Sequence, residues 1–443
     1  VFSYSSTPVI GVYDGSSWTE QSASYSSGNF TTTSNVSFTA STAQTLATGN
    51  SGFTSAGTNP AGTYVAAFSG NFSNAAIWTT DALGVVTPAS APTASSDVLI
   101  PTGVTLTLEA PTTVNSLTAN GTGNMAGAYA LTTGTLTVNS TAFTPAGNII
   151  VNGNTTIGAG AVYTTAGLTT NGNADVSGQV KTTTTAGGSV VTWILQGASP
   201  VITVNSGGVI GGTGVGVSGE GLRFYLNHSG TATFQGDGTV NIARLHTNSG
   251  NTSHQTTTVN INMNINNTAS NVQVLTLQNG NNGSGTKTLN IGAGKTVKLT
   301  QANGYLHAAS GTGGGTNTCG AINYNVYGTL DVSSGGSTGN TVAVNVKSGG
   351  TLKLGATNNL YTTLAGQTAP AIVPESGSTV EIAGSSAPVF NVGNVSGATT
   401  PSYPSSYYNL TVNNTNGVTL PNSTTVNNTL NLAAGTLATG SNT

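Results

Sequence analysis

Val259-Asn-Ile-Asn-Met-Asn-Ile-Asn266 alternates strictly between an apolar residue and asparagine. Successive side chains of a β-strand point to opposite sides, so this period of two predicts a strand with one buried and one solvated face. We therefore expect Val259, Ile261, Met263 and Ile265 to point into a core. The stretch is the clearest example of a pattern that runs through most of the chain.

Short apolar phrases of the same kind recur along the sequence, separated by turns rich in Gly, Asn and Ser. Several neighbouring copies lie about 20 residues apart, for example Leu410 and Leu430. This period predicts an all-β fold, a parallel β-helix or β-solenoid, whose coils stack about 4.8 Å apart and bury their inward residues against neighbouring coils. The copies lie at 114–118, 134–138, 148–152, 201–205, 288–291, 328–332, 351–354, 379–382, 409–412 and 429–432.

We expect residues from about 95 to 443 to form one continuous stack of roughly 15 coils, about 70 Å long at the usual strand spacing. The alternative is a β-sandwich or an array of hairpins, in which Asn-Gly pairs join antiparallel strands. Asn152-Gly153, Asn171-Gly172 and Asn416-Gly417 are candidates for such turns. Their flanking sequences fit the solenoid repeat equally well, and the recurrence of the phrase favours the solenoid.

Only 4% of the 443 residues are charged, whereas an ordinary soluble domain carries roughly 25%. This argues against most enzymes, and against nucleic-acid binders, which need many basic contacts to phosphate. Gly contributes 62 residues, but 36% of the chain is hydrophobic and gathered in short Val, Ile and Leu runs, enough to bury a long, narrow core. We expect almost no helix and no cofactor.

Three isolated features have simple interpretations. Cys319 is the one cysteine of the chain, so it cannot form an internal disulfide, and we expect it to be a small buried hydrophobic residue. Trp193 lies within an apolar run and is expected in the core. No apolar run approaches the roughly 18 residues of a membrane span, and the sequence starts at Val1 without a leader, so we expect a mature, exported protein.

Residues 1–68 differ from the rest of the chain. They lack the repeat and are rich in aromatic residues, so we divide the chain into an N-terminal β-rich arm or cap domain at 1–68 and a β-solenoid domain at 69–443. The break falls at Ser69-Gly-Asn-Phe-Ser-Asn-Ala-Ala-Ile-Trp78. The aromatic residues of the first segment are Phe2, Tyr4, Tyr13, Trp18, Tyr25, Phe30, Phe38, Phe53, Tyr64 and Phe68.

The start of the repeat region carries a resemblance. The break just described leads through a Pro-rich loop to Asp97-Val-Leu-Ile-Pro-Thr-Gly-Val-Thr-Leu-Thr-Leu108 and then to Val114-Asn-Ser-Leu117. This order, together with the closing Tyr407-Tyr-Asn-Leu-Thr-Val412, resembles the repetitive β-solenoid modules of secreted Bacteroidota surface proteins that use the type IX secretion route. The resemblance implies a solenoid fold and an extracellular or cell-surface location. Such proteins usually end in a sorting domain, for which this sequence shows no candidate.

The densest group of chemically active residues lies between Glu220 and His254. Carboxylates and arginines in one patch are what a solenoid polysaccharide lyase or glycosidase would need. The spacing, however, lacks an adjacent acid pair, so we interpret the group as the solvated face of an inserted loop and expect Glu220, Arg223, Asp237 and Arg244 not to converge on one cleft. His228, His246 and His254 lack the pairing of a metal site, and we predict no catalytic residue and no metal ligand. The group consists of Glu220, Arg223, His228, Asp237, Arg244, His246 and His254.

Charge is distributed unevenly along the chain. Residues 1–180 contain six acids and no Lys or Arg, whereas the remainder contains eight bases and five acids. In a stack that follows the sequence, opposite signs would lie toward opposite ends and favour contacts between the head of one molecule and the tail of another.

The ends of a solenoid expose unpaired backbone groups and apolar core, and solenoids normally carry caps. The repeat pattern continues to the end of the sequence without a recognisable cap, while the first residues are apolar and β-prone. We expect the N-terminal region of one molecule to pair by β-strands with the C-terminal end of the next, which is a contact that does not close and makes a filament. The expected assembly interface is Val1, Phe2, Tyr4, Val9, Ile10, Val12, Tyr13, Leu430, Leu432 and Leu437.

The sequence therefore predicts an extracellular structural protein that polymerises with itself. One alternative is a monomeric cell-surface adhesin or glycan-binding stalk, with surface glycans as partners. A lyase or glycosidase is the third possibility. Another alternative for the N-terminal segment is that residues 1–68 fold back to cap their own solenoid. We expect no nucleic-acid partner and no membrane span.

Overall fold

A computed structural model gives the fold of the chain. It describes residues 63–80, 88, 90–182, 190–211, 221–227, 229–247, 256–268, 285–300, 322–334, 343–355, 372–384, 404, 406–420 and 423–438. For 8–13, 18–26, 29–32, 45–50, 273–278 and 305–309 it gives the strands without side chains.

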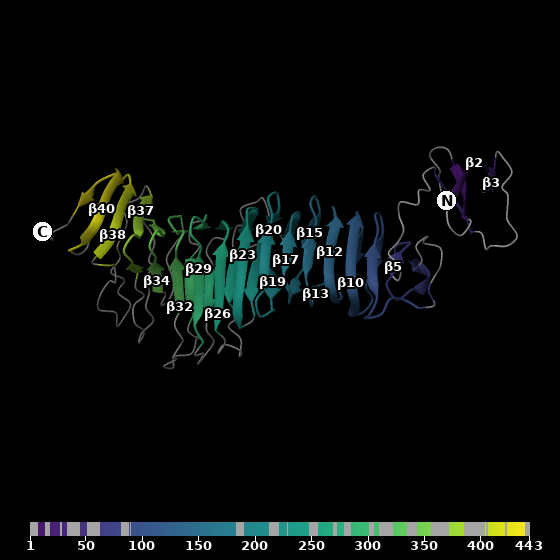
Figure 1. Ribbon diagram of the computed structural model, residues 1–443, viewed down its shortest axis with the longest axis horizontal. Helices are drawn as coiled ribbons and strands as arrows, with labels where there is room; N and C mark the ends of the chain where they lie inside the picture. Colours follow the sequence, from purple (N-terminus) through teal and green to yellow (C-terminus); the bar gives the residue numbers. More distant parts are fainter. Residues whose placement is uncertain are drawn as a thin grey trace.

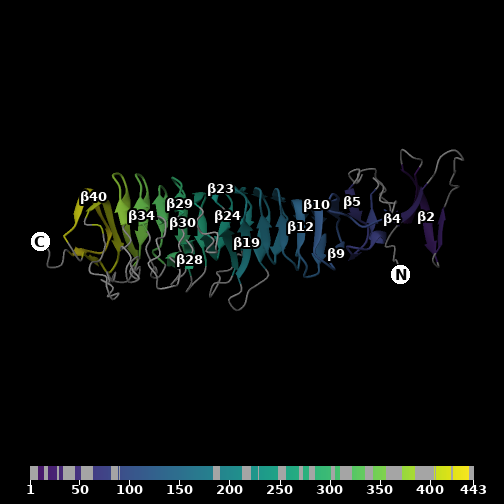
Figure 2. The same ribbon diagram turned by 90° about the horizontal axis from the view of Figure 1, so that it is seen from below.

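The protein is an elongated parallel β-solenoid (Figure 1), which confirms the predicted fold class. Within the described residues the one helical segment is the short 3-10 turn η1 (Ala75–Ile77). Each central coil contributes three strands, and equivalent strands of successive coils pair in parallel, so the stack has three faces. A quarter turn of the molecule shows the same stack from below, with strands running across its length (Figure 2).

The three faces are named in the order in which a coil passes through them. The first face consists of β13 (Ile149–Val151), β16 (Leu168–Thr170), β19 (Val190–Leu195), β22 (Gly221–Leu226), β25 (Arg244–Thr247), β28 (Gln273–Gln278) and β31 (Tyr305–Ala309). The second face consists of β5 (Thr63–Ala66), β8 (Asp97–Ile100), β14 (Thr155–Ile157), β17 (Ala174–Val176), β20 (Val201–Val204), β23 (Gly230–Gly236), β26 (Thr257–Asn262), β29 (Lys287–Ile291), β32 (Ile322–Val326), β34 (Ala343–Val346) and β36 (Ile372–Pro374). The long strands β10 (Thr112–Gly121) and β12 (Leu131–Ser140) run through both faces.

The third face is continuous to the C-terminal end. Its eleven-stranded sheet consists of β15 (Val162–Thr165), β18 (Gln179–Thr182), β21 (Val209–Ile210), β24 (Thr239–Ile242), β27 (Ile265–Asn267), β30 (Thr296–Leu299), β33 (Thr329–Asp331), β35 (Thr351–Leu354), β37 (Thr379–Gly384), β38 (Ser406–Asn414) and β40 (Thr425–Ala434). Shorter sheets join β6 (Gly70–Asn71), β9 (Thr105–Thr107) and β11 (Asn124–Ala126) near the N-terminal end, and β39 (Val418–Thr419) and β41 (Leu437–Ala438) near the C-terminal end.

Coil length is regular at first and then variable. Leu117 pairs with Val98 on one side and with Leu136 on the other, so the first coils are short and contain equal numbers of residues. Later coils are much longer, as the pairing of Ile291 with Val326 shows. The last step is short again, with Leu410 opposite Leu430 as the sequence predicts.

Fourteen coils can be followed through the described strands from β8 to β40, close to the predicted number, and at about 4.8 Å per step they extend about 60 Å. The sandwich alternative is wrong. Asn152-Gly153 separates β13 from β14, and both strands pair in parallel with the next coil rather than with each other. These Asn-Gly pairs are therefore bends within a coil and not hairpin turns.

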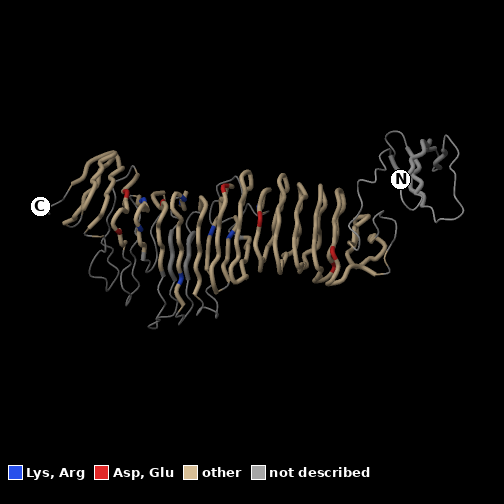
Figure 3. The backbone as a smooth tube through the Cα atoms, viewed as in Figure 1, with Lys and Arg blue, Asp and Glu red and all other residues tan. Residues whose placement is uncertain are grey.

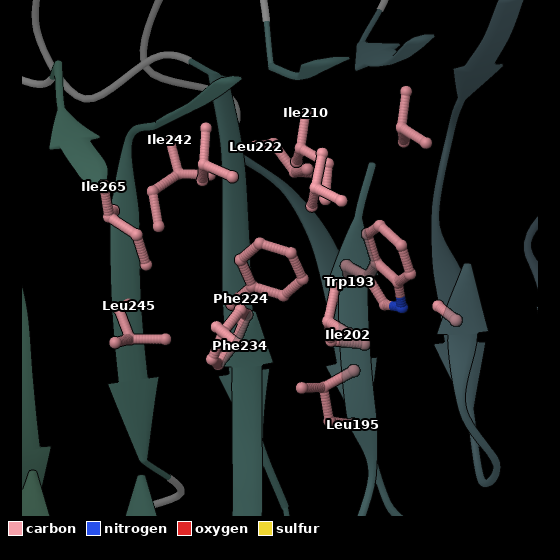
Figure 4. Close-up of a cluster of buried hydrophobic side chains, with 14 of the residues drawn as sticks. Trp193, Leu195, Ile202, Ile210, Leu222, Phe224, Phe234, Ile242, Leu245 and Ile265 are labelled. Carbon is pink, nitrogen blue, oxygen red and sulfur yellow. The ribbon is translucent and has the colours of Figure 1, made fainter. Parts of the chain in front are cut away.

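A single apolar core fills the inside of the stack (Figure 4). Val259, Ile261, Met263 and Ile265 are all buried, which confirms the predicted inward face. The alternation continues across the corner between β26 and β27, so one unbroken sequence pattern serves two faces. Trp193 is fully buried, as expected, and its ring contacts Phe224 of the next coil at 5.1 Å between centroids. Each such inward aliphatic or aromatic side chain contributes about 1.5–3 kcal/mol through burial.

The N-terminal residues form a small antiparallel sheet of their own. Its strands, in the spatial order β3-β2-β1-β4, are β1 (Pro8–Tyr13), β2 (Trp18–Ser26), β3 (Asn29–Thr32) and β4 (Thr45–Asn50). The solenoid begins before the predicted division at 68/69, because β5 pairs in parallel with β8.

Candidate functional site

The C-terminal end of the stack is uncovered within the described residues. β40 pairs with β38 on one side, and within the described residues no strand lies against its other side. Most of its side chains are exposed, including Leu430 at 46% and Leu432 at 53%. The terminal strand thus combines a free backbone edge with exposed apolar side chains.

These two leucines continue the inward rows of the core. Val380 pairs with Leu410 and Leu410 with Leu430, while Val412 pairs with Leu432. Leu410 and Val412 are fully buried because the next coil covers them. Among the described residues no such cover lies over Leu430 and Leu432, so the cross-section of the core reaches solvent at this end. Leu437, the third predicted interface residue of this region, is half-buried against the core.

The opposite end of the stack is closed by aromatic side chains. β7 (Trp78–Thr79) runs antiparallel to β5 and forms the last pairing there. Trp78 is fully buried, contacts the rings of Phe72 and Tyr64 in edge-to-face geometry, and donates from its indole Nε1 to the carbonyl oxygen of Phe72 at 3.0 Å. The segment 69–78, where the sequence predicts a division of the chain, is therefore part of a cap on the stack.

Glu109 fixes the loop of this cap. Its carboxylate accepts hydrogen bonds from the Asn71 side chain at 2.6 Å and from the hydroxyl and backbone N–H of Ser73. An acid in the first coils thus has a local structural role. The two ends of the stack consequently differ: one is covered by its own chain and the other is open in the described structure.

The predicted N-terminal half of the interface lies in the small sheet or outside the described residues. Val1, Phe2 and Tyr4 are not described. Residues 9, 10, 12 and 13 belong to β1, which pairs with β2 on one side and β4 on the other. β1 is therefore an inner strand, and the free edges of this sheet belong to β3 and β4. The assignment of these residues to an interface stays a prediction.

Ion pairs occupy the third face and its corners, where Figure 3 shows sparse acidic and basic segments along the stack. Lys353 and Glu381 are register partners on adjacent coils and lie 3.0 Å apart, and Lys298 and Asp331 repeat the arrangement at 3.9 Å. Partly exposed pairs of this kind add only about 0–1 kcal/mol each. Their main effect is to neutralise charge between coils.

The segment from Glu220 to His254 is not an inserted loop, and that interpretation is wrong for its described residues. Residues 221–247 form β22 to β25, one complete turn of the stack and the start of the next, because Leu222, Phe224 and Leu226 alternate inward. Glu220, His228 and His254 lie outside the described residues.

Two of the four described members of that group, the arginines, come together. Arg223 and Arg244 are register partners on adjacent strands of the first face. Asp237 lies at the corner between β23 and β24 and forms an ion pair with Lys295 at 3.5 Å. The described residues therefore bring the arginines side by side without Asp237. The alternation of apolar and polar residues around the two arginines could have indicated strands. Their register could not be predicted, because the coils differ in length.

Groups of three or more potential metal ligands do not occur within the described residues. Among the described residues, no helix has the length and hydropathy that crossing a membrane requires. Comparison with protein-family models, with curated proteins and with solved structures finds no match to this chain.

Proposed function

We propose that this protein is an extracellular structural subunit that joins head to tail into filaments, with the N-terminal sheet of one molecule adding to β40 of the next. The observation that carries the proposal is the open edge of β40, where Leu430 and Leu432 expose the end of the core. An uncovered apolar edge strand is a template for pairing with another strand. Catalysis has no part in this function.

The partner surface is the N-terminal sheet because the other end of the solenoid is closed by Trp78. The small sheet has two free edges, β3 and β4, and β1 joins β4 to β2. Adding one of these edges to β40 would continue the sheet from one molecule to the next. Such a contact uses different surfaces on the two partners and does not close, so it generates a filament.

The test compares the wild type with three variants by negative-stain microscopy and light scattering. Leu430→Asp/Leu432→Asp places charge on the open end, and deletion of 1–13 removes β1. Tyr327→Asp is the matched control, because Tyr327 is similarly exposed at 44% but lies between β32 and β33, which both have a paired strand on each side. We expect filaments from the wild type and the control, and monomers from the other two variants.

Mixing the two monomeric variants sharpens the test. The deletion variant retains an intact β40, and the leucine variant retains an intact N-terminal sheet, so the mixture should give a one-to-one dimer and nothing longer. A wild type that stays monomeric at high concentration would contradict the proposal and favour a monomeric adhesin or stalk. Filaments that persist in either variant would contradict the assigned surfaces.

A further inference from the structure

The second face of the stack carries two columns of uncharged polar side chains. Thr231, Thr258 and Thr288 are register partners on successive coils, and Asn323 continues their column on the next coil. A second column runs beside the first, two residues further along the same strands. It consists of Thr233, Asn260, Asn290, Asn325 and Asn345. The strands that carry the columns, β23, β26, β29, β32 and β34, lie side by side in Figure 1.

Both columns face outward. The residues that alternate with them, such as Ala232, Val259 and Leu289, are buried in the core, whereas the side chains of the columns are partly exposed. Lys287 is the one charged residue on these strands, and it lies on the inward side. The third face, by contrast, carries the lysine–carboxylate pairs described above. The second face is therefore polar without being charged along these coils.

The two columns form a regular polar grid. Strands of neighbouring coils lie about 4.8 Å apart, and residues two apart on one strand lie about 6.6 Å apart. Hydrogen bonds between the amides fix the second column, because Asn290 donates to Asn260 and accepts from Asn325. An asparagine amide has two N–H groups and an oxygen with two lone pairs, so an amide bonded on both sides keeps one N–H and one lone pair for solvent. Threonine is β-branched, which restricts its rotamers in the first column. The outward polar groups thus repeat in two dimensions with little freedom.

We propose that the polar grid binds the surface of ice. Water molecules hydrogen-bonded to the grid would adopt its spacing, and a rectangle of these dimensions approximates the repeat of oxygen atoms on a prism face of hexagonal ice. Charged side chains would impose hydration shells that do not fit this lattice, and the grid contains none. The inference is independent of filament formation, because it concerns the side of the stack and not its ends.

Other occupants fit the polar grid less well. Sites for small molecules are concave, whereas the grid is the outer face of a sheet. A second copy of the chain would bury the remaining N–H and hydroxyl groups of the grid, and each buried group would then need a partner of its own. The surface of a crystal made of water supplies a donor or an acceptor at every position.

The test measures thermal hysteresis and the fraction of protein that enters a slowly growing ice crystal. The full chain carries Leu430→Asp/Leu432→Asp, so assembly does not contribute and failure of the filament proposal leaves the result interpretable. We expect thermal hysteresis and enrichment in the ice, from which a globular reference protein of similar mass is excluded. Thr258→Tyr/Thr288→Tyr places two rings within the polar grid and should abolish both signals, because tyrosine suits a strand but keeps a crystal surface away.

Thr329→Tyr/Thr351→Tyr is the matched control. These threonines are also register partners on neighbouring coils, but they lie on the third face beside Asp331 and Lys353. The control should keep both signals. Equal loss in the two double variants would overturn the proposal, and so would a parent protein that shows neither hysteresis nor enrichment in ice. If that parent instead binds crystalline chitin, and the polar-grid variant alone abolishes the binding, the face binds polysaccharide and not ice. Circular dichroism of each variant checks that the stack is intact.

Discussion

Asn325 donates from its side-chain amide to the Oδ1 atom of Asn290 on the coil before it, at 2.9 Å, and accepts from Asn345 on the coil after it at the same distance. Asn290 in turn donates to Asn260 at 2.9 Å. The outward asparagines of the second face thus form a hydrogen-bonded ladder over four coils. The Asn alternation of the sequence marks a polar surface, and the ladder gives that surface a structural role.

Breaking this ladder should destabilise the stack locally. Asn325→Ala removes two side-chain hydrogen bonds and leaves part-buried groups of Asn290 and Asn345 without this partner. We expect a loss of about 1–2 kcal/mol, seen as a lower midpoint in thermal melts followed by circular dichroism. Asn323→Ala is the control, because Asn323 lies on the same strand and its side chain makes no hydrogen bond among the described residues. It should change stability by less than about 0.5 kcal/mol, and equal losses would contradict a specific role for the ladder.

A second prediction concerns two buried threonines that differ in hydrogen bonding. Thr170 is fully buried and accepts from the indole Nε1 of Trp193 at 2.5 Å. Thr155 is equally buried, but its hydroxyl has no partner in the described part of the chain. Thr→Val exchanges a hydroxyl for a methyl of similar size. Thr170→Val should cost about 1–3 kcal/mol, because the indole N–H loses its acceptor, whereas Thr155→Val should be neutral or stabilise by about 1 kcal/mol. Destabilisation by both variants in denaturant titrations would show that a bound water or another group satisfies Thr155.

A third prediction uses two glycines with positive φ. Gly103 has φ +79° and open space where a Cβ would lie. Gly127 has φ +88°, but a Cβ would lie 2.2 Å from the carbonyl oxygen of Leu108. Gly103→Ala should cost about 1 kcal/mol for backbone strain alone. Gly127→Ala should cost several times more, because the backbone of the neighbouring coil has to move. Similar melting temperatures for the two variants would contradict the close approach of these coils.

The solenoid could be predicted because its inward rows follow a simple rule. Val259, Ile261 and Met263 alternate with asparagine, and each inward residue needs only another apolar residue one coil away. The place of Leu430 in an apolar row could be predicted for the same reason, because Leu430 continues the pattern of Leu410 one coil later. Local alternation and short period are sufficient for both conclusions.

The sequence does not reveal which residues lie side by side on neighbouring coils. The step along the chain from Arg223 to its register partner Arg244 is shorter than the step from Phe234 to its partner Ile261. Coils of unequal length leave the register undetermined until the strands are placed. The position of β1 between β2 and β4 could not be predicted either, because an apolar strand at the start of a chain fits a free arm and a small sheet equally well.

Lys287 gives the last prediction, a dependence of stability on pH. It lies on the inward side of β29, is 3% exposed, and donates from Nζ to the hydroxyl of Thr257 at 3.0 Å. Burial lowers its pKa from 10.5 to about 8. Between these values the unfolded chain binds more protons than the folded one, so folding stability should rise as the pH rises from about 8 to 10.5. Below pH 8 the lysine is charged in both states and the full cost of burying the charge, at most about 3 kcal/mol, remains.

Lys287→Met should remove this dependence, because methionine fills a similar volume without a charge. At neutral pH the variant should melt at a higher temperature than the wild type, and the two melting temperatures should converge as the pH approaches 10.5. Lys181→Met is the control. Lys181 lies on β18 and is only half-buried, so the same substitution there should change the melting temperature at neutral pH much less than Lys287→Met does. A Lys287→Met variant whose melting temperature runs parallel to that of the wild type across this range would show that Lys287 titrates as a solvated lysine.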